Sequence, residues 1–293
     1  MVVGFLLWWG IYAPADFGSE GEIIFKIEKG QGSKEIALNL EKKGLITWAP
    51  IFRMYVLVTG KSKKLKAGDY LFSEPMNIQD IVKKIVIGDI IKEKITIIEG
   101  WNLKDIGFYF EQKGMFQAEE LWEFRDLEGY LFPDTYWVRR DESLAEIVQK
   151  MKDNFEKKTA PHRSEISKET IIMASLIEKE VSKKDDKELV SGILWKRLRA
   201  DIHLQVDATI SYITGKKTTK ISKEETQIDS PYNTYLYKGL PPGPISNPGL
   251  ESILAAAYPK DSEFWYYLST PEGKTVFSKT LEEHNLAKAK YLK

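Results

Sequence analysis

The chain contains no cysteine, and this absence excludes disulfides and thiolate metal sites. Only three histidines occur, at positions 162, 203 and 284, and they lack a ligand-like spacing, which argues against a metal site. Net charge is also absent: lysine plus arginine and aspartate plus glutamate number 43 each. The sequence has neither a positive net charge nor a dense basic cluster that would attract nucleic acid, so nucleic acid is not an expected partner. The length of 293 residues is nevertheless enough for two domains.

Long apolar runs are absent except at the N-terminus. Residues 2–13 carry no charged side chain, but a full membrane span needs about 20 such residues. The basic leader of a secretory signal is missing as well. Trp8, Trp9 and Tyr12 resemble an interfacial aromatic belt. We therefore predict that residues 1–19 form a transmembrane or signal-anchor segment, with a buried helix as the alternative.

Two segments that lie seventy positions apart repeat one pattern. Gly30 and Gly44 bracket the first copy, and Gly100 and Gly114 bracket the second. Each copy is expected to form a short strand, an amphipathic helix and a glycine stop. Small α+β units of this kind serve either as binding modules or as spacers, and the repeat alone does not decide between them.

Two carboxylates lie in a segment, 170–181, that otherwise has the pattern of a buried helix. Its apolar side chains point in nearly every direction, which is typical of a helix surrounded by protein. Glu178 falls beside Ala174, Ser175 and Ser182, where small side chains leave room for a ligand. Burial disfavours the charged form, so Glu178 is expected to hold its proton and to serve as a general acid. The alternative is that it pairs with a lysine and only shapes the core.

The second half also contains stiff irregular structure. Prolines and glycines in 239–249 exclude regular elements and fix the backbone path. Ser167 is the expected N-cap of the Glu178 helix, and Asn247 is placed to cap a helix that begins at Pro248. A hairpin is expected around residues 264–277.

Five strings, in order, resemble the endolytic murein transglycosylase family, the MltG or YceG-like proteins. They are EGYLFPDTY, ASLIEKE, LQVDATI, SPYNTY followed by GLPPGPISNPGLESILAAAYP, and VFSKTLEEHN. The resemblance implies an α+β protein with an N-terminal membrane anchor, a small LysM-like α+β domain at 20–95 and a mixed α/β catalytic domain at 96–293 that contains a buried catalytic helix. Thr275 stands where relatives often carry histidine, which leaves the role of the hairpin open.

The resemblance also implies the site. Glu178, the first acid of the EKE string, corresponds to the catalytic glutamate. The residues expected to contact sugar are polar or aromatic: Gln205, Asp207, Ser230, Tyr232, Asn233 and Tyr235. The alternatives are a helix cap for Asp207 and simple packing for the tyrosines. Glu180 is interpreted as a structural partner, and Asp134 as a residue that fixes its own turn.

One acid is sufficient for the implied reaction, whereas ordinary glycosidases use paired carboxylates. In a lytic transglycosylase the muramyl C6 hydroxyl attacks its own C1. Glu178 would first protonate the departing oxygen and then remove the C6 hydroxyl proton, leaving a 1,6-anhydromuramyl end. In lysozyme an apolar pocket raises a glutamate pKa to about 6, which suits such a double role. No metal or organic cofactor is required.

The sequence thus predicts an enzyme of the bacterial cytoplasmic membrane that cuts nascent peptidoglycan strands internally, with its catalytic domain on the periplasmic or extracellular side. Penicillin-binding protein synthases are the expected protein partners. One alternative is a non-catalytic glycan-binding scaffold for cell-wall synthases. Another is a pyridoxal phosphate lyase of the aminodeoxychorismate type, but the predicted anchor and the lack of a lysine in a suitable setting argue against it.

Overall fold

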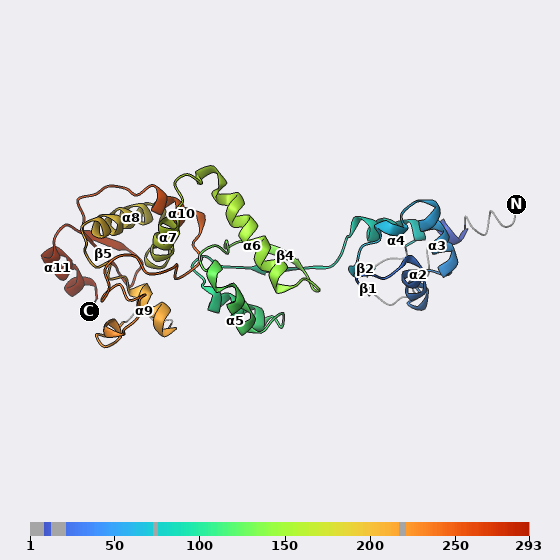
Figure 1. The fold of residues 1–293 in the computed structure, drawn as a ribbon, viewed down its shortest axis with the longest axis horizontal. Coiled ribbons are helices and arrows are strands. Elements are labelled where there is room, and N and C mark those ends of the chain that lie inside the picture. Colours follow the sequence, from blue (N-terminus) through green and yellow to red (C-terminus); the bar gives the residue numbers. More distant parts are fainter. Residues whose placement is uncertain (1–8, 13–21, 73–75, 217–220, 293) are drawn as a thin grey trace. The chain divides into compact units, whose positions relative to one another are not determined.

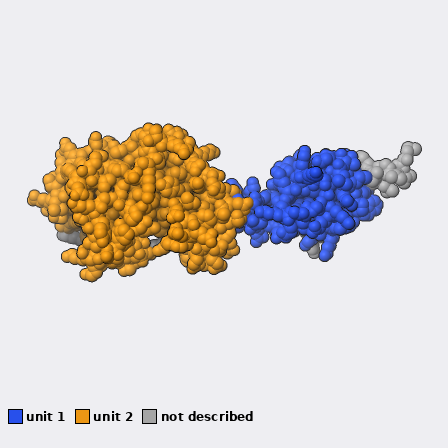
Figure 2. Space-filling view, viewed as in Figure 1, with its two compact units in different colours: residues 1–95, 137–142 blue, residues 96–136, 143–293 orange. Residues whose placement is uncertain are grey.

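A computed structural model describes residues 9–12, 22–72, 76–216 and 221–292. The chain divides into two compact units (Figure 2): the first holds the residues up to 95 together with 137–142, and the second holds the rest. Both are mostly helical with small two-stranded sheets (Figure 1), so the predicted α+β class is confirmed. Of the predicted anchor only residues 9–12 are described. No helix among the described residues has the length and apolar character needed to span a bilayer.

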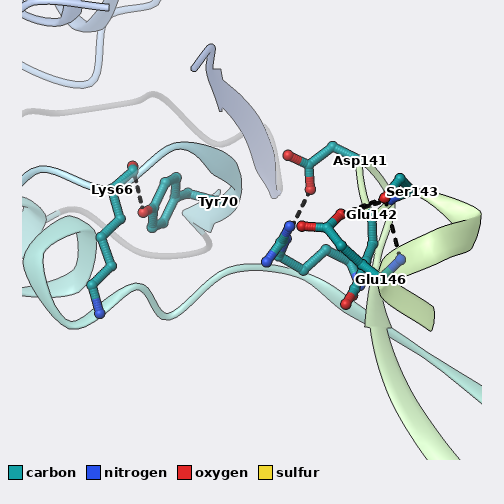
Figure 3. Close-up of polar contacts among 7 residues, drawn as sticks. Lys66, Tyr70, Asp141, Glu142, Ser143 and Glu146 are labelled. Atoms are coloured by element: carbon teal, nitrogen blue, oxygen red, sulfur yellow. Dashed lines mark hydrogen bonds and ion pairs between the residues drawn. The ribbon is translucent and has the colours of Figure 1, made fainter. Parts of the chain in front are cut away.

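The first unit is built around one antiparallel strand pair. β1 (Ile23–Ile27) pairs with β2 (Gly68–Phe72), and Phe25 lies opposite Tyr70 with both side chains in the core. The helices of this unit are α2 (Ser33–Lys42), α3 (Ala49–Val58), η1 (Ser62–Lys64) and α4 (Ile78–Ile87). The buried Tyr70 hydroxyl donates to the Lys66 carbonyl at 2.8 Å (Figure 3), which satisfies its polar end.

The predicted repeat is confirmed by the backbone. β3 (Lys92–Thr96) and α5 (Leu103–Gln112) repeat the order of β1 and α2. Gly44 and Gly114 both adopt positive φ, at 74° and 66°. Each donates its N–H to a carbonyl three residues earlier at 2.9 Å, which ends the two helices alike.

A further strand and helix complete the second copy, as β2 and α4 complete the first. β4 (Thr135–Arg139) forms a two-stranded sheet with β3, and α6 (Leu144–Thr159) follows. Ser143 caps α6 in a capping box with Glu146 (Figure 3). The strand and the helix that follow the first copy therefore have counterparts after the second.

Helix α7 (Lys168–Glu180) is the centre of the second unit. It packs against α8 (Lys184–Arg199), α9 (Asp207–Thr214) and α10 (Leu250–Ala257). All of its residues from 170 to 177 are buried, as the sequence pattern indicates. Ser167 accepts the Thr170 N–H at 3.2 Å, which confirms the predicted N-cap.

The remaining elements are η2 (Ala118–Leu127), η3 (Ala160–His162), η4 (Glu225–Gln227), β5 (Tyr266–Ser269), β6 (Thr275–Ser278) and α11 (Leu281–Tyr291). The antiparallel pair β5–β6 confirms the predicted hairpin. Sheets of the described residues contain two strands each, so the second unit has a helical core rather than a larger α/β sheet.

The prediction that Asn247 caps a helix is wrong. Gly249 is the N-cap of α10, and it makes no side-chain capping bond. The fully buried Asn247 side chain accepts the N–H groups of Gly129 and Leu131 at 2.9 and 3.0 Å and donates to the Trp101 carbonyl at 3.0 Å. Asn247 holds three chain segments together because buried backbone groups need partners.

Candidate active site

The Glu178 side chain lies in an internal polar cluster. Its carboxylate accepts from the Lys187 ammonium at 3.2 Å, the Gly249 N–H at 2.9 Å and the Ser252 hydroxyl at 2.7 Å. The side chains of Glu178 and Lys187 are only 7% and 3% exposed. This is the lysine pairing that the sequence left open as the alternative to catalysis. A buried pair of this kind holds α7, α8 and α10 to one another.

The space beside Glu178 is filled by the chain itself. The small residue Ser175 was expected to leave room for a ligand, but its hydroxyl accepts the Ile245 N–H at 3.1 Å. The Ser246 hydroxyl donates to the Ser175 carbonyl, also at 3.1 Å. The proline-rich segment therefore occupies the side of α7 on which substrate was predicted.

A large groove opens at the C-terminal end of α7 instead. Its volume is about 2090 Å³. Among the described residues that line it are four that the sequence analysis singled out, namely Glu180, Gln205, Asp207 and Tyr235. Glu178, Ser230, Tyr232, Asn233 and Asp134 do not belong to this lining.

Glu180 is the last residue of α7, and it lines the groove. The Tyr267 hydroxyl and the Ala208 backbone N–H both donate to it. Burial, reinforced by the nearby Asp207 charge, raises the pKa of Glu180 to about 7. Ala208 lies in the first turn of α9, where free N–H groups and the helix dipole favour a carboxylate. Glu180 is thus placed both to hold a proton near neutral pH and to bear the charge when the proton leaves.

Asp207 and Tyr235 form a second polar pair in the groove. The Tyr235 hydroxyl donates to the Asp207 carboxylate. Burial, together with this bond, raises the pKa of Tyr235 above its ordinary value. The Asp207 side chain makes no capping bond in α9 and accepts from Tyr235 instead. The contacts therefore do not support the alternative that Asp207 is a helix cap.

Gln205 is held in a strained backbone conformation. Its φ of 55° is one of two positive values among non-glycine residues in the described chain. The buried Arg197 guanidinium donates to its side-chain oxygen at 3.0 Å and to the His203 carbonyl at 2.7 Å. With the oxygen fixed, the amide nitrogen of Gln205 is the end that remains for a ligand.

Three predicted sugar contacts have structural roles. Asn233 is fully buried, donates to the Ile228 carbonyl at 2.8 Å and accepts the Tyr235 N–H at 2.9 Å. Tyr232 packs its ring 5.0 Å from that of Tyr212. Ser230 accepts the Tyr232 N–H at 3.3 Å within the same loop. These residues shape the loop that presents Tyr235.

Asp134 accepts the N–H of the adjacent Thr135 at 2.7 Å, within its own turn, and the side-chain amide of Asn154 on α6 at 3.0 Å. Two residues at the groove were missed. Tyr267 lies on β5, in the hairpin whose role the sequence left open, and Arg197 lies on α8, to which no functional role was assigned. No motif in the sequence marked these two residues, because only the packing of the hairpin and α8 brings them to the groove.

No group of three or more histidine, aspartate or glutamate side chains in the described chain is arranged to hold a metal ion.

Comparisons with known proteins agree with the resemblance of the motifs. The YceG-like family matches residues 25–290. An endolytic murein transglycosylase of Bacillus subtilis (strain 168) is 31% identical over 330 residues, covering 100% of this chain and 91% of that protein. One from Streptococcus pneumoniae serotype 2 (strain D39 / NCTC 7466) is 30% identical; the match covers 93% of this chain but 59% of the longer relative. A crystal structure of a yceG-like protein, lmo1499 from Listeria monocytogenes, has 34% identity and a TM-score of 0.62, covering 92% of this chain and 100% of that one.

Proposed function

The chain belongs to the YceG-like family, and we propose that it is an endolytic murein transglycosylase in which Glu180 is the acid and base. The position of Glu180 carries this proposal. It is the acid of α7 that lines the large groove, whereas Glu178 is enclosed by Lys187, Gly249 and Ser252. The role first expected of Glu178 is therefore assigned to the acid two residues further on.

The reaction needs only this acid and the substrate. Protonated Glu180 gives its proton to the glycosidic oxygen as the bond from muramyl C1 breaks. The C6 hydroxyl of the same sugar then attacks C1, and the Glu180 carboxylate takes the hydroxyl proton. The products are a 1,6-anhydromuramyl end and a free hydroxyl on the departing sugar, and Glu180 returns to its protonated form. The Tyr267 and Ala208 donors stabilise the carboxylate between these two steps.

Three neighbours are assigned to substrate binding. Gln205 offers its amide nitrogen to acceptors such as the acetamido carbonyl of a murein sugar, because Arg197 occupies its oxygen. In the same groove, the Asp207 carboxylate offers a hydrogen-bond acceptor and Tyr235 offers the face of its ring. The strained backbone at Gln205 fits a residue whose orientation matters for function.

Replacement of Glu180 by Gln tests the proposal. The amide keeps the shape of the side chain but transfers no proton, so the release of anhydromuramyl ends should fall by about 10²-fold or more. The measurement is digestion of purified peptidoglycan followed by mass separation of anhydro and reducing ends. Retention of binding to glycan strands without cleavage is expected. Unchanged cleavage by this variant would refute the role of Glu180, and a wild-type protein that binds but never cleaves would favour the scaffold.

Glu178→Gln is the matched control. It leaves Lys187 buried without its carboxylate, so we expect a loss of about 3–5 kcal/mol in the free energy of unfolding. The folded fraction should still produce anhydro ends. Urea unfolding and the same digestion separate the two effects. If Glu178→Gln abolished cleavage while the fold kept its full stability, the two glutamates would have to exchange roles again.

We propose further that residues 1–19 anchor the protein in the bacterial cytoplasmic membrane, with the enzyme on the periplasmic or extracellular side. The uncharged run at 2–13 supports this. We also propose that residues 20–95 act as a LysM-like glycan-binding module and that penicillin-binding protein synthases, which make the strands, are partners. Membrane fractionation with external protease treatment tests the location: a protein that stays in the soluble fraction would contradict it.

A further inference from the structure

The groove extends well beyond the surroundings of Glu180. Its volume of about 2090 Å³ is roughly twice the upper size of a pocket for a small molecule, about 1,000 Å³. Part of its lining comes from Trp101, which lies just before α5, from Phe108 of α5 and from Trp122 of η2. Phe108 and Trp122 are 53% and 56% exposed. We call these three residues, with α5 and η2, the aromatic wall.

The aromatic wall is a fixed surface. A Cβ added to Gly107 of α5 would lie 2.7 Å from the Ala118 carbonyl oxygen, so this glycine lets η2 pack directly on the α5 backbone. The Trp101 ring lies 5.3 Å from that of Tyr109. The first contact fixes the two helices to one another, and the second restrains the Trp101 ring, which lowers the entropy lost when a ligand binds.

The internal repeat provides a comparison within the chain. The second copy carries Trp101 and Phe108, which line the groove, and the first copy carries Gln31 and Leu38 at the positions seventy residues earlier. Trp122 is left out of this comparison, because the position seventy residues before it also holds an aromatic residue, Phe52. Two copies that share strands, helices and glycine stops therefore differ in aromatic content on the face that lines the groove. Folding of the module does not require these rings, because the first copy forms without them.

We propose that the aromatic wall binds further sugar units of the strand that Glu180 cleaves. Sugar rings present apolar C–H faces that pack on aromatic rings, while their hydroxyls stay in water. Uncharged aromatic rings suit the C–H faces of a polysaccharide better than a charged ligand. The wall shares one groove with Glu180, so its occupant is the same glycan strand. This inference rests on the proposed function, and it makes the enzyme select long strands over short ones.

The test compares cleavage of long and short glycans. Full-length wild-type protein and the variants Phe108→Ala, Trp122→Ala and the double variant are assayed on peptide-free glycan strands and on a murein tetrasaccharide. We expect the ratio of kcat/KM for long over short substrates to fall about tenfold for each large ring removed. Binding of long strands by the same variants carrying Glu180→Gln should weaken by a similar factor.

Tyr258→Ala is the matched control, because Tyr258 is an aromatic residue that is 49% exposed and does not line the groove. Its long-to-short ratio should equal that of the wild type. An unchanged ratio in the double variant, or an equal fall in the control, would overturn the assignment of the aromatic wall. Failure of the proposed function would look different, since the wild type itself would then release no anhydromuramyl ends from either substrate.

Discussion

Glu178 and Glu180 are separated by one residue, yet the helix turns by about 200° between them and gives them different surroundings. The Glu178 carboxylate accepts hydrogen bonds from Lys187 and the Gly249 N–H, whereas Glu180 lines the groove. The sequence placed two acids on a buried helix correctly. It could not choose between them, because the small residues beside Glu178 make room for protein as readily as for a ligand.

A pH profile tests the electrostatics at Glu180. Burial and then the Asp207 charge raise its pKa to about 7, so the acid form is lost as the pH rises through 7 and activity should fall above that value. Asp207→Asn removes one cause of the increase. We therefore expect the alkaline limb of the kcat/KM profile to move to lower pH. A limb that stays in place, or moves to higher pH, would show that Asp207 does not act on Glu180 through its charge.

At the scale of elements, the sequence predicted correctly those features that depend on residues close together in the chain. The repeat, the cap at Ser167 and the hairpin follow from glycine stops, capping residues and alternation, and all three are present. Asn247 shows the limit of such signals. Its position before a proline suggests a cap, but its partners lie more than a hundred residues away in sequence. Long-range partners of this kind leave no mark on the neighbouring residues.

Ser167→Ala should weaken α7 at its start. The substitution removes the bond to the Thr170 N–H, and the loss of an N-cap costs about 1 kcal/mol. Urea unfolding followed by tryptophan fluorescence measures the change. Ser164 is exposed and lies three residues earlier, so Ser164→Ala should stay within about 0.5 kcal/mol of the wild type. Equal effects of the two substitutions would argue against the cap.

At the scale of the whole molecule, the two units have separate hydrophobic cores. One contains Phe52, Tyr70 and Phe72, and the other surrounds α7. The resemblance of the motifs implied two domains, divided between residues 95 and 96. It did not indicate that the second copy of the repeat would supply a wall of the groove, since this depends on how η2 and α5 pack in the second unit.

Phe52→Ala should affect one core only. Phe52 is fully buried, and truncation of such a residue costs about 3–5 kcal/mol. Hydrogen exchange followed by mass spectrometry should show faster exchange in α2, α3 and α4, with α7 unchanged. Faster exchange of α7 to the same extent would mean that the two cores unfold as one.

Asn247 has a consequence for the aromatic wall. Its side chain joins the backbone near Trp101, at the start of the aromatic wall, to residues 129 and 131, and its own backbone leads into α10 beside Glu178. One buried amide therefore holds the backbone at the start of the aromatic wall to two other segments of the second unit. The end of the wall at Trp101 thus depends on a side chain that lies outside the groove lining.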